Sequence, residues 1–489
     1  MNFLDKHKII FILSLVFLVL LLGVVSVYSF QFDLTSGKIY SVTDYSKRFL
    51  SGLPDYLTVS FFYSDKLSKS FPYKDSILRI LNEFQKLSDG KITVLNINPD
   101  TPDGKRKAEN YGLIPHQIMS VQSSSEIYEV VYSGIVLEYR GQVLTIPIIL
   151  TPENLEYEFI SKVTRLVEPK DYRVVFFNCT GWEDSLFNYA YEVLYNEGID
   201  ILFNPANYEE TVNCQVLVVF GDTNVSTEQE EIINRWVKDG KKSLFAISPA
   251  GIDIAGNWVS RPKEESRFQI LFNLFGLSLK NNFVLDYSNV RLALLNKNGT
   301  GYDMFNYPFW PRVIPSGNSV ILNGLSSIDF FWPGYIETEP NYDLKITPLA
   351  ETGKLSWLDE ITAGTDPYQD FQADQETMGE HLIAVSSENK NSELILVADE
   401  LFVSNLIESS NGVFNLYFFS QAVQHLLGLD DILSLKKNYL IYNPLIFSGQ
   451  SEDNSKTIMN IYLCLFLLIP LLIVFIFILV RFYIKKYGK

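Results

Sequence analysis

Apolar residues gather into two long runs, one near each end of the chain. Ile9–Tyr28 holds no charged residue, and Ile461–Val480 is interrupted only by Pro470. A helix of about 20 residues spans the roughly 30 Å hydrocarbon core of a bilayer, and proline inside such a helix is tolerated. The pattern therefore predicts transmembrane helices over residues 9–29 and 458–481.

The flanks of these helices predict their orientation. Lysines precede the first helix, and four basic residues, Arg481, Lys485, Lys486 and Lys489, follow the second. Because positive residues stay on the cytoplasmic side, we expect cytoplasmic tails at residues 1–8 and 482–489. The chain is then a two-pass protein of the cytoplasmic (inner) membrane with its bulk outside the cytoplasm.

A cleaved signal peptide is the alternative interpretation of the first apolar run. The run is longer than the 7–15 apolar residues of a signal, and Val27-Tyr28-Ser29 is a poor small-residue cleavage site. Retention of the first helix as an anchor is the favoured interpretation.

Between the anchors, the pattern predicts two α/β domains, over residues 30–168 and 169–435, followed by a linker over 436–457. In the first domain, a strand–helix–strand order is typical of a βαβ unit and is reminiscent of thioredoxin-like folds. No Cys-x-x-Cys occurs there, which excludes dithiol redox chemistry. The predicted strands are Leu57–Tyr63, Lys91–Ile97, Glu129–Tyr139 and Gln142–Ile149, and the predicted helices are Thr43–Ser51, Asp75–Leu87 and Glu153–Leu166.

In the second domain, strands alternate with helices, which indicates a parallel sheet covered on both faces. The predicted strands are Arg173–Phe177, Ile199–Phe203, Gln215–Phe220, Ser243–Ile247 and Glu393–Ala398, with helices over Leu186–Asn196, Thr227–Lys238 and Asn411–Leu427. Residues 250–390 are harder to interpret, with strand-like pieces at 281–286, 319–323 and 344–348.

Charge restricts the partners. The chain carries a net charge of −17 although both termini are basic, so the acidic excess lies between the membrane helices. Because no basic patch offsets it, we do not expect the chain to bind nucleic acid, and we expect lipid contact through the membrane helices.

The cysteines are predicted to be free thiols. Cys179 follows one predicted strand and Cys214 precedes another, so in a parallel sheet they lie at opposite ends, too far apart for a disulfide. The third, Cys464, falls within the second apolar run.

Catalytic motifs are missing where an α/β sheet would place them. Ser248 follows a predicted strand, but Ile247 before it and Pro249 after it do not suit a nucleophile elbow, which needs small residues on both sides. The sequence also lacks a glycine-rich phosphate loop and a Walker motif, so we do not expect the chain to hydrolyse ATP.

Metal sites are not predicted either. The histidines His7, His116, His381 and His425 are isolated, without ligand spacing. The acidic run Asp359–Glu380 would align Asp366, Asp370 and Asp374 if it were helical, but it lacks the pattern of a calcium loop, and a solvated surface loop is favoured. We therefore expect no catalytic residue, no metal ligand and no cofactor.

Several motifs resemble one family in their order along the chain. They include Phe32-Asp33-Leu34-Thr35 and Tyr40 after the first membrane helix, Gly181 and Glu183 in Thr180-Gly181-Trp182-Glu183, and Asp399 and Asn405 in the stretch Val397–Asn405. This order resembles the gliding-motility-associated ABC transporter auxiliary proteins, the GldG-like family. Trp182, Ala398 and Glu400 depart from the family pattern.

The resemblance implies a flavodoxin/amidotransferase-like α/β domain without a catalytic cysteine. It also implies an ABC-2-type permease and a separate ATPase as partners of a non-catalytic auxiliary subunit that resembles a substrate-binding protein, with an unknown substrate. An extracytoplasmic adhesion or scaffold protein is the first alternative, suggested by the aromatic segments Phe305–Trp310 and Phe330–Tyr335. A membrane-anchored hydrolase that uses Ser248 or Cys179 is the second.

Overall fold

The computed structural model describes residues 41–436, except residues 123–124, 254–257, 264, 297, 316, 340–342, 362–363, 370 and 391. The two apolar runs, both tails and the motif residues Phe32, Asp33, Leu34, Thr35 and Tyr40 lie outside this range. Among the described residues, no helix combines the length and apolar character that a membrane span requires. The membrane helices thus remain predictions from sequence.

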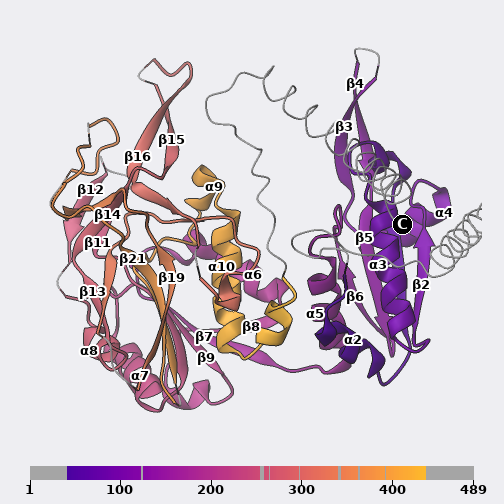
Figure 1. Cartoon of the computed structure of the whole chain (residues 1–489), viewed down its shortest axis with the longest axis horizontal. Helices are drawn as coiled ribbons and strands as arrows, with labels where there is room; N and C mark the ends of the chain where they lie inside the picture. The colour runs from indigo at the N-terminus through magenta and orange to yellow at the C-terminus, as the bar shows by residue number, and fades with distance from the viewer. Residues whose placement is uncertain are drawn as a thin grey trace, which may run out of the picture. The chain divides into compact units, whose positions relative to one another are not determined.

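The N-terminal part is built on a four-stranded mixed sheet with the order β2-β1-β5-β6 (Figure 1). Strands β1 and β2 are parallel and flank helix α3, which is the predicted βαβ unit. The hairpin β5–β6 turns at Arg140-Gly141, both with positive φ. Its strands are β1 (Leu57–Tyr63), β2 (Ile92–Ile97), β5 (Ser133–Tyr139) and β6 (Gln142–Ile146).

Helices with one apolar face cover this sheet. Helix α3 (Lys74–Leu87) buries Ile77, Ile80, Leu81 and Phe84, the helical spacing seen in the sequence. The ring of Phe84 lies 4.7 Å from that of Phe159 on α5, centroid to centroid. The other helices are α2 (Asp44–Ser51), α4 (Pro102–Asn110) and α5 (Leu155–Val167).

Two elements of this part differ from the prediction. The prediction of a single strand over Glu129–Tyr139 is wrong, because the strand is interrupted at Tyr132. The N–H of Tyr132 donates to Ser64 Oγ, and its carbonyl accepts the Ser64 N–H. The residues before the break form β4 (Ser125–Val131), which pairs with β3 (His116–Gln122) in a separate ribbon. Helix α4 was not predicted, since its sequence is polar and it buries only Gly104 and Ala108.

The second part is built on a seven-stranded sheet with the order β19-β21-β22-β10-β9-β7-β8. Five strands are parallel, as predicted, and β21 and β19 run antiparallel at one edge. The strands are β7 (Tyr172–Asn178), β8 (Ile199–Phe203), β9 (Val216–Phe220), β10 (Lys242–Ala246), β19 (Lys345–Glu351), β21 (Leu382–Glu388) and β22 (Glu393–Val397).

Helices cover both faces of this sheet. Phe220 pairs with Ala246 in the β9–β10 register, whereas Phe245 pairs with Val219, so the two phenylalanines point to opposite faces. Phe220 packs on Phe419 of α10, and Phe245 packs on Phe272 of α8. The helices are α6 (Asn188–Asn196), α7 (Thr227–Lys238), α8 (Gln269–Asn273), α9 (Ile407–Ser410), α10 (Val413–Leu426) and α11 (Asp430–Leu433).

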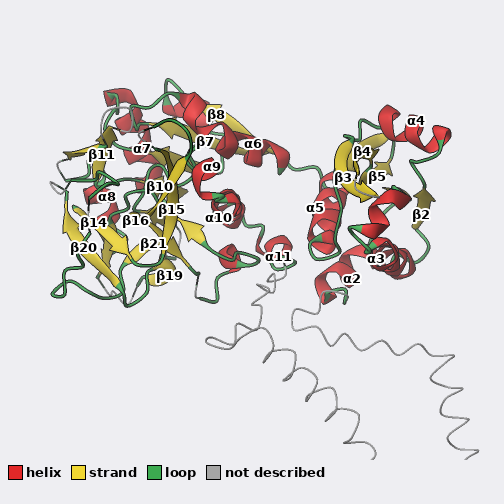
Figure 2. Cartoon of the chain, turned by 90° about the horizontal axis from the view of Figure 1, so that it is seen from above, coloured by secondary structure: helices red, strands yellow, loops and turns green. Residues whose placement is uncertain are grey.

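A long insertion, residues 247–392, separates the neighbouring strands β10 and β22 and is rich in short strands (Figure 2). It also supplies β19 and β21. The strand-like pieces predicted at 281–286 and 344–348 correspond to strands β14 and β19. The piece at 319–323 is instead a single 3₁₀ turn, η4 (Val320–Leu322), which the Ser319 hydroxyl caps. The other strands of the insertion pair as follows: β11 (Ala250–Asp253) with β12 (Val259–Pro262), β13 (Leu277–Lys280) with β18 (Tyr335–Thr338), β14 (Asn282–Asp286) with β20 (Ser356–Glu360), and β16 (Tyr302–Val313) with both β15 (Asn289–Leu295) and β17 (Ile328–Asp329).

Aromatic side chains form the core of the insertion. Tyr307, Trp310 and Trp332 are buried, and their rings pack on one another and on Trp258. The predicted segments Phe305–Trp310 and Phe330–Tyr335 therefore contribute mainly to the core. In the described part of the acidic run 359–380, no helix aligns the acidic residues, and the end of β20 is its only regular element.

A histidine that lies between two acidic side chains connects helix α10 to the sheet. His425 Nε2 lies 2.8 Å from Glu393 Oε1 at the start of β22, and Nδ1 lies 2.6 Å from Asp430 Oδ1. Burial alone would lower the pKa of His425, but the two carboxylates outweigh it and raise the pKa. Burial would raise the pKa of Glu393, but His425, Ser386 and Lys242 lower it to about 2.

These opposite shifts predict a stability optimum on the acidic side of neutrality. A raised histidine pKa stabilises the fold below the unfolded pKa of 6.5, and this contribution is lost as pH rises through the folded pKa. The contribution of Glu393 is lost as pH falls from 4.5 towards 2. We expect His425→Gln to cost about 1–3 kcal/mol at pH 6 and less at pH 9, measured by urea unfolding of the full-length protein in detergent.

His116→Gln serves as the control, because His116 makes no carboxylate contact among the described residues. An equal loss for His425→Gln at pH 6 and pH 9 would contradict the charged pairing.

Candidate functional site

The carboxyl ends of the parallel strands meet at a pocket of about 350 Å³ in the second part of the chain. Gly181 and Trp182 follow β7, Thr223 follows β9 and Glu400 follows β22, while the hairpin β11–β12 forms the opposite wall. In open α/β sheets, ligands bind at this end of the strands. The position makes this pocket the first candidate for a functional site.

A turn after β7 forms one side of the pocket. Thr180 Oγ1 donates to Asn178 Oδ1 at 2.7 Å, and Asn178 Nδ2 donates to the Trp182 carbonyl at 3.0 Å. Gly221 lies behind this turn with φ +72°, and a Cβ there would come within 2.5 Å of Thr180 Cα. The close approach of the two loops therefore requires glycine at this position.

A buried ion cluster lies at the base of the pocket. Lys263 Nζ is 2.8 Å from Glu400 Oε2 and 3.5 Å from Asp222 Oδ1. The side chains of Glu400 and Asp222 are only 3% and 6% exposed, so water screens this cluster weakly. Burial would lower the pKa of Lys263, but the two acids raise it, whereas burial raises the pKa of Glu400.

Asp399 is buried beside this cluster without lining the pocket. Its carboxylate accepts the N–H groups of Phe331 at 2.6 Å and Leu401 at 2.7 Å. Burial raises the pKa of Asp399 to about 8 despite these bonds. The side chain thus connects the end of β22 to the aromatic segment of the insertion.

The remaining motif residues shape the loops. Asn405 donates its backbone N–H to the Leu186 carbonyl at 2.8 Å and its side-chain Nδ2 to the Ser185 carbonyl at 3.3 Å, which ties the loop after β22 to the turn after β7. Glu183 is exposed and precedes a short 3₁₀ helix, η2 (Asp184–Phe187). Of the four motif positions singled out within the described range, Gly181 lines the pocket, and Glu183, Asp399 and Asn405 do not.

Both candidate nucleophiles, Ser248 and Cys179, are buried, and the Ser248 hydroxyl also accepts a hydrogen bond. Ser248 Oγ accepts the Glu400 N–H at 2.8 Å and is 4% exposed. Burial, together with Asp222 and Glu400, raises the pKa of Cys179 to about 12. The side-chain partner of His381 is Ser356, and those of His425 are Glu393 and Asp430, so neither histidine is bonded to Ser248 or Cys179.

Sequence reasoning missed Lys263 and Asp222. Asp222 had a signal, since it closely follows a strongly apolar strand, but Lys263 lies in the insertion that the pattern could not resolve. Both cysteines of the described range are free thiols, as predicted. Within that range, no group of three or more His, Cys, Asp and Glu side chains could hold a metal ion.

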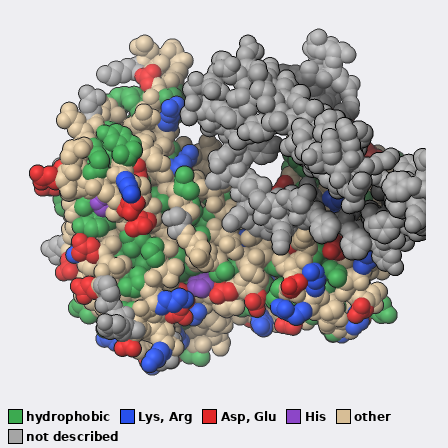
Figure 3. All heavy atoms as spheres, viewed as in Figure 1, with side chains coloured by type: hydrophobic (Ala, Val, Ile, Leu, Met, Phe, Trp, Pro, Cys, Tyr) green, Lys and Arg blue, Asp and Glu red, His purple; other side chains and the backbone are tan. Residues whose placement is uncertain are grey.

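The surface of the described part offers mixed charge. On the face seen in Figure 3, Lys and Arg side chains are interspersed with Asp and Glu.

Comparison with known proteins gives two family matches. Residues 184–427 match the model of a family described as an ABC-type uncharacterized transport system (ABC_transp_aux), and residues 36–138 match a domain of unknown function (DUF7088). An uncharacterized protein of Borreliella burgdorferi is 21% identical over 362 residues, which cover 71% of this chain and 69% of that protein.

Similar solved structures share little sequence. A ThuA-like protein of Bacteroides uniformis has a TM-score of 0.31 and 11% identity, covering 52% of this chain and 91% of its own. A GMP synthase component of Thermoplasma acidophilum has a TM-score of 0.25 and 13% identity, covering 53% of this chain and 98% of its own.

We expect Lys263→Met to destabilise the protein by about 3–5 kcal/mol, because it leaves two buried carboxylates without their cation. The measurement is urea unfolding of the full-length protein in detergent. Lys280→Met is the matched control, since its pair with Glu337 is far more exposed, and it should cost less than about 1 kcal/mol. Equal losses in the two variants would contradict a desolvated cluster.

The raised pKa of Cys179 predicts an unreactive thiol. In the folded protein near neutral pH, iodoacetamide should leave Cys179 unmodified, whereas the urea-unfolded protein should react, because the thiolate is the nucleophile. Peptide mass spectrometry resolves Cys179 from Cys214 and Cys464. Rapid labelling of Cys179 in the folded protein would contradict this burial.

Proposed function

Because residues 184–427 match a family of ABC-type transport auxiliary components, we propose that this chain is a membrane-anchored auxiliary subunit of an ABC-type transporter. In this proposal, a separate ABC-2-type permease and a separate ATPase form the transporter, and this chain is non-catalytic. The predicted hairpin of two membrane helices would pack on the permease, with the α/β body outside the cytoplasm.

The family match is the observation on which this proposal rests, and the pocket is the place where we expect a ligand to bind. Most residues that line the pocket, including Arg261, Lys263 and Glu400, fall inside the matched range. A concave site with a few convergent polar groups suits a small polar ligand. We infer that the pocket serves the transporter by binding such a ligand, as a substrate-binding subunit would.

A non-catalytic role is supported by the state of the candidate nucleophiles. The Ser248 hydroxyl is occupied by a backbone N–H, and the Cys179 thiol has a raised pKa, the opposite of what an activated nucleophile needs. The aromatic segments that suggested an adhesion or scaffold protein give it little support, because their residues Tyr307, Trp310 and Trp332 are buried. The transporter role is therefore the function that we favour.

Affinity purification of the full-length protein in a mild detergent, followed by mass spectrometry, tests the proposal. We expect a multi-span permease and a Walker-containing ATPase in the eluate. An unrelated ABC complex from the same cells, purified in parallel, shows that the detergent preserves such assemblies. Recovery of the protein alone under those conditions would contradict the transporter role and favour a scaffold.

A further inference from the structure

The pocket at the carboxyl ends of the parallel strands, the pocket at Lys263, is lined by two acids and two bases that are paired with each other. Arg261 Nη2 lies 3.0 Å from Asp253 Oδ2, and Lys263 Nζ lies 2.8 Å from Glu400 Oε2. Asp222, the second partner of Lys263, does not line the pocket. A charged ligand has to compete with a partner that is already in place, and removing the cation from the buried Glu400 costs several kcal/mol. The wall therefore favours a ligand without net charge.

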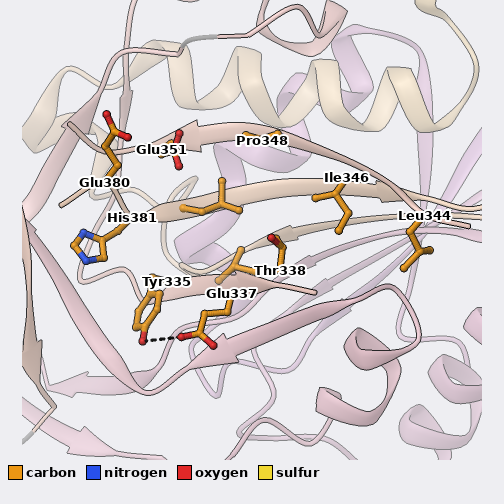
Figure 4. A pocket seen from close by; sticks show the side chains of 11 residues that line it. Tyr335, Glu337, Thr338, Leu344, Ile346, Pro348, Glu351, Glu380 and His381 are labelled. Atoms are coloured by element: carbon orange, nitrogen blue, oxygen red, sulfur yellow. Dashed lines mark hydrogen bonds between the residues drawn. The ribbon is translucent and has the colours of Figure 1, made fainter. Parts of the chain in front are cut away.

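Paired charges distinguish this pocket from a larger one in the same part of the chain. That pocket, of about 550 Å³, lies between β18, β19 and β21, and Figure 4 shows His381 at one end of it. The lining of this pocket at His381 contains Glu337, Glu351 and Glu380 but neither Lys nor Arg. The two pockets share no lining residue, so charge pairing within the wall is a feature of the pocket at Lys263.

An ion pair still offers hydrogen bonds to a third group. A guanidinium has five N–H donors and an ammonium has three, while a carboxylate accepts at several lone pairs. Donor and acceptor lie side by side in each pair, which matches a hydroxyl group, because a hydroxyl both donates and accepts. A ligand with several hydroxyls can therefore bind to such pairs without breaking them.

Trp182 adds an aromatic side chain to the wall. It is half-buried against the core, and its ring contacts no other aromatic ring among the described residues. Its indole N–H also has no hydrogen-bond partner in the described part of the chain. An aromatic ring packs on the C–H groups of a sugar ring, and an indole N–H can donate to a hydroxyl. Because Trp182 departs from the pattern of the family that the sequence resembles, this feature belongs to the chain itself.

Gly251 leaves space in the wall that the hairpin β11–β12 forms. It pairs with Arg261 across the hairpin, so position 251 is on the same face as Arg261 and Asp253. The neighbours Ala250 and Ile252 are buried in the core. A Cβ at Gly251 would have Arg261 Cβ, at 4.0 Å, as its nearest contact, and the φ of Gly251 is not in the left-handed region. The backbone therefore does not require glycine here, and the missing side chain leaves room for a ligand.

From these features, we propose that the pocket at Lys263 binds a neutral carbohydrate. A sugar ring packs on Trp182, and its hydroxyls bond to the paired side chains of the wall. The volume of about 350 Å³ is at the lower end of the range for small-molecule sites, which suits a small sugar. This inference rests on the proposed function, because it names the substrate class of the site that we assign to the transporter.

Isothermal titration of the full-length protein at pH 6, in a detergent without a sugar head group, tests this proposal. The probes are D-glucose, D-galactose and D-mannose, each compared with its uronic acid and its 2-amino derivative, which carry a negative and a positive charge. We expect at least one neutral sugar to bind, and its two charged derivatives to bind at least about tenfold more weakly. The proposal is overturned if none of the neutral sugars binds or if a charged derivative binds equally well.

Variants assign the binding to this pocket. Gly251→Val fills the space in the wall, and it should weaken sugar binding at least about tenfold without lowering the unfolding midpoint in urea. Gly353→Val is the matched control, because a Cβ there also meets no atom within 4 Å and Gly353 does not line the pocket. Trp182→Ala should weaken binding about tenfold, and Trp182→Phe, which keeps a ring, should weaken it less. Unchanged affinity in Gly251→Val would overturn the proposal even if Trp182→Ala failed to fold.

The substrate class and the transporter role can fail separately. If the neutral sugars do not bind but a permease and an ATPase are recovered with the protein, the carbohydrate inference is wrong and the transporter role stands. If a neutral sugar binds but those partners are not recovered, the site is a carbohydrate site and the transporter role is wrong.

Discussion

The seven-stranded sheet depends on the neutralisation of acidic side chains at its carboxyl end. The central parallel strands β9 and β22 are buried on both faces, so residues that follow them enter a region with little water, and three of these residues are Asp222, Asp399 and Glu400. An uncompensated carboxylate in such a place costs several kcal/mol. Burial raises the pKa of Asp399 to about 8, so this side chain is largely uncharged near neutral pH while it accepts two backbone N–H groups, and Lys263 lies between the other two acids. The sheet and the insertion that carries Lys263 are therefore energetically linked.

The insertion supplies most of the chemistry as well as this counter-charge. Its hairpin β11–β12 forms a wall of the pocket at Lys263, and its strands β18, β19 and β21 enclose the pocket at His381. The two pockets differ in character, because one has a buried lysine at its base whereas the lining of the other has acids and no basic residue. The insertion thus lines two pockets that differ in the charged residues at their walls.

Local sequence pattern predicted the regular elements well where apolar residues repeat. Helix α7 begins and ends as predicted because its apolar positions have helical spacing and Ser226 with Gln229 forms a capping box. The parallel strands were predicted for a similar reason, since each is a short run in which apolar residues predominate. Helix α4 was missed because it has almost no buried face, and 319–323 was misassigned because three apolar residues fit a turn as well as a strand.

The site was less predictable than the fold for a physical reason. Lys263 meets Glu400 across 137 positions of sequence, and Ser356 meets His381 across 25 positions. Neither contact has a local signature, because both arise from strand pairings between distant segments. Gly181, Asp399 and Asn405 could be selected from motif resemblance, but their roles in a turn, a buried bond and a loop contact depend on that long-range geometry.

The position of β22 also has a consequence for how the protein is made. Strand β22 pairs with β10 and β21 in the middle of the sheet, yet residues 247–392 must leave the ribosome before it is available. Until then, the hydrophobic strand β10 keeps one unpaired edge, which is the type of surface that recruits other chains. A nascent chain that stalls within the insertion is therefore exposed to aggregation, and productive biogenesis requires that this edge be shielded until the last central strand has emerged.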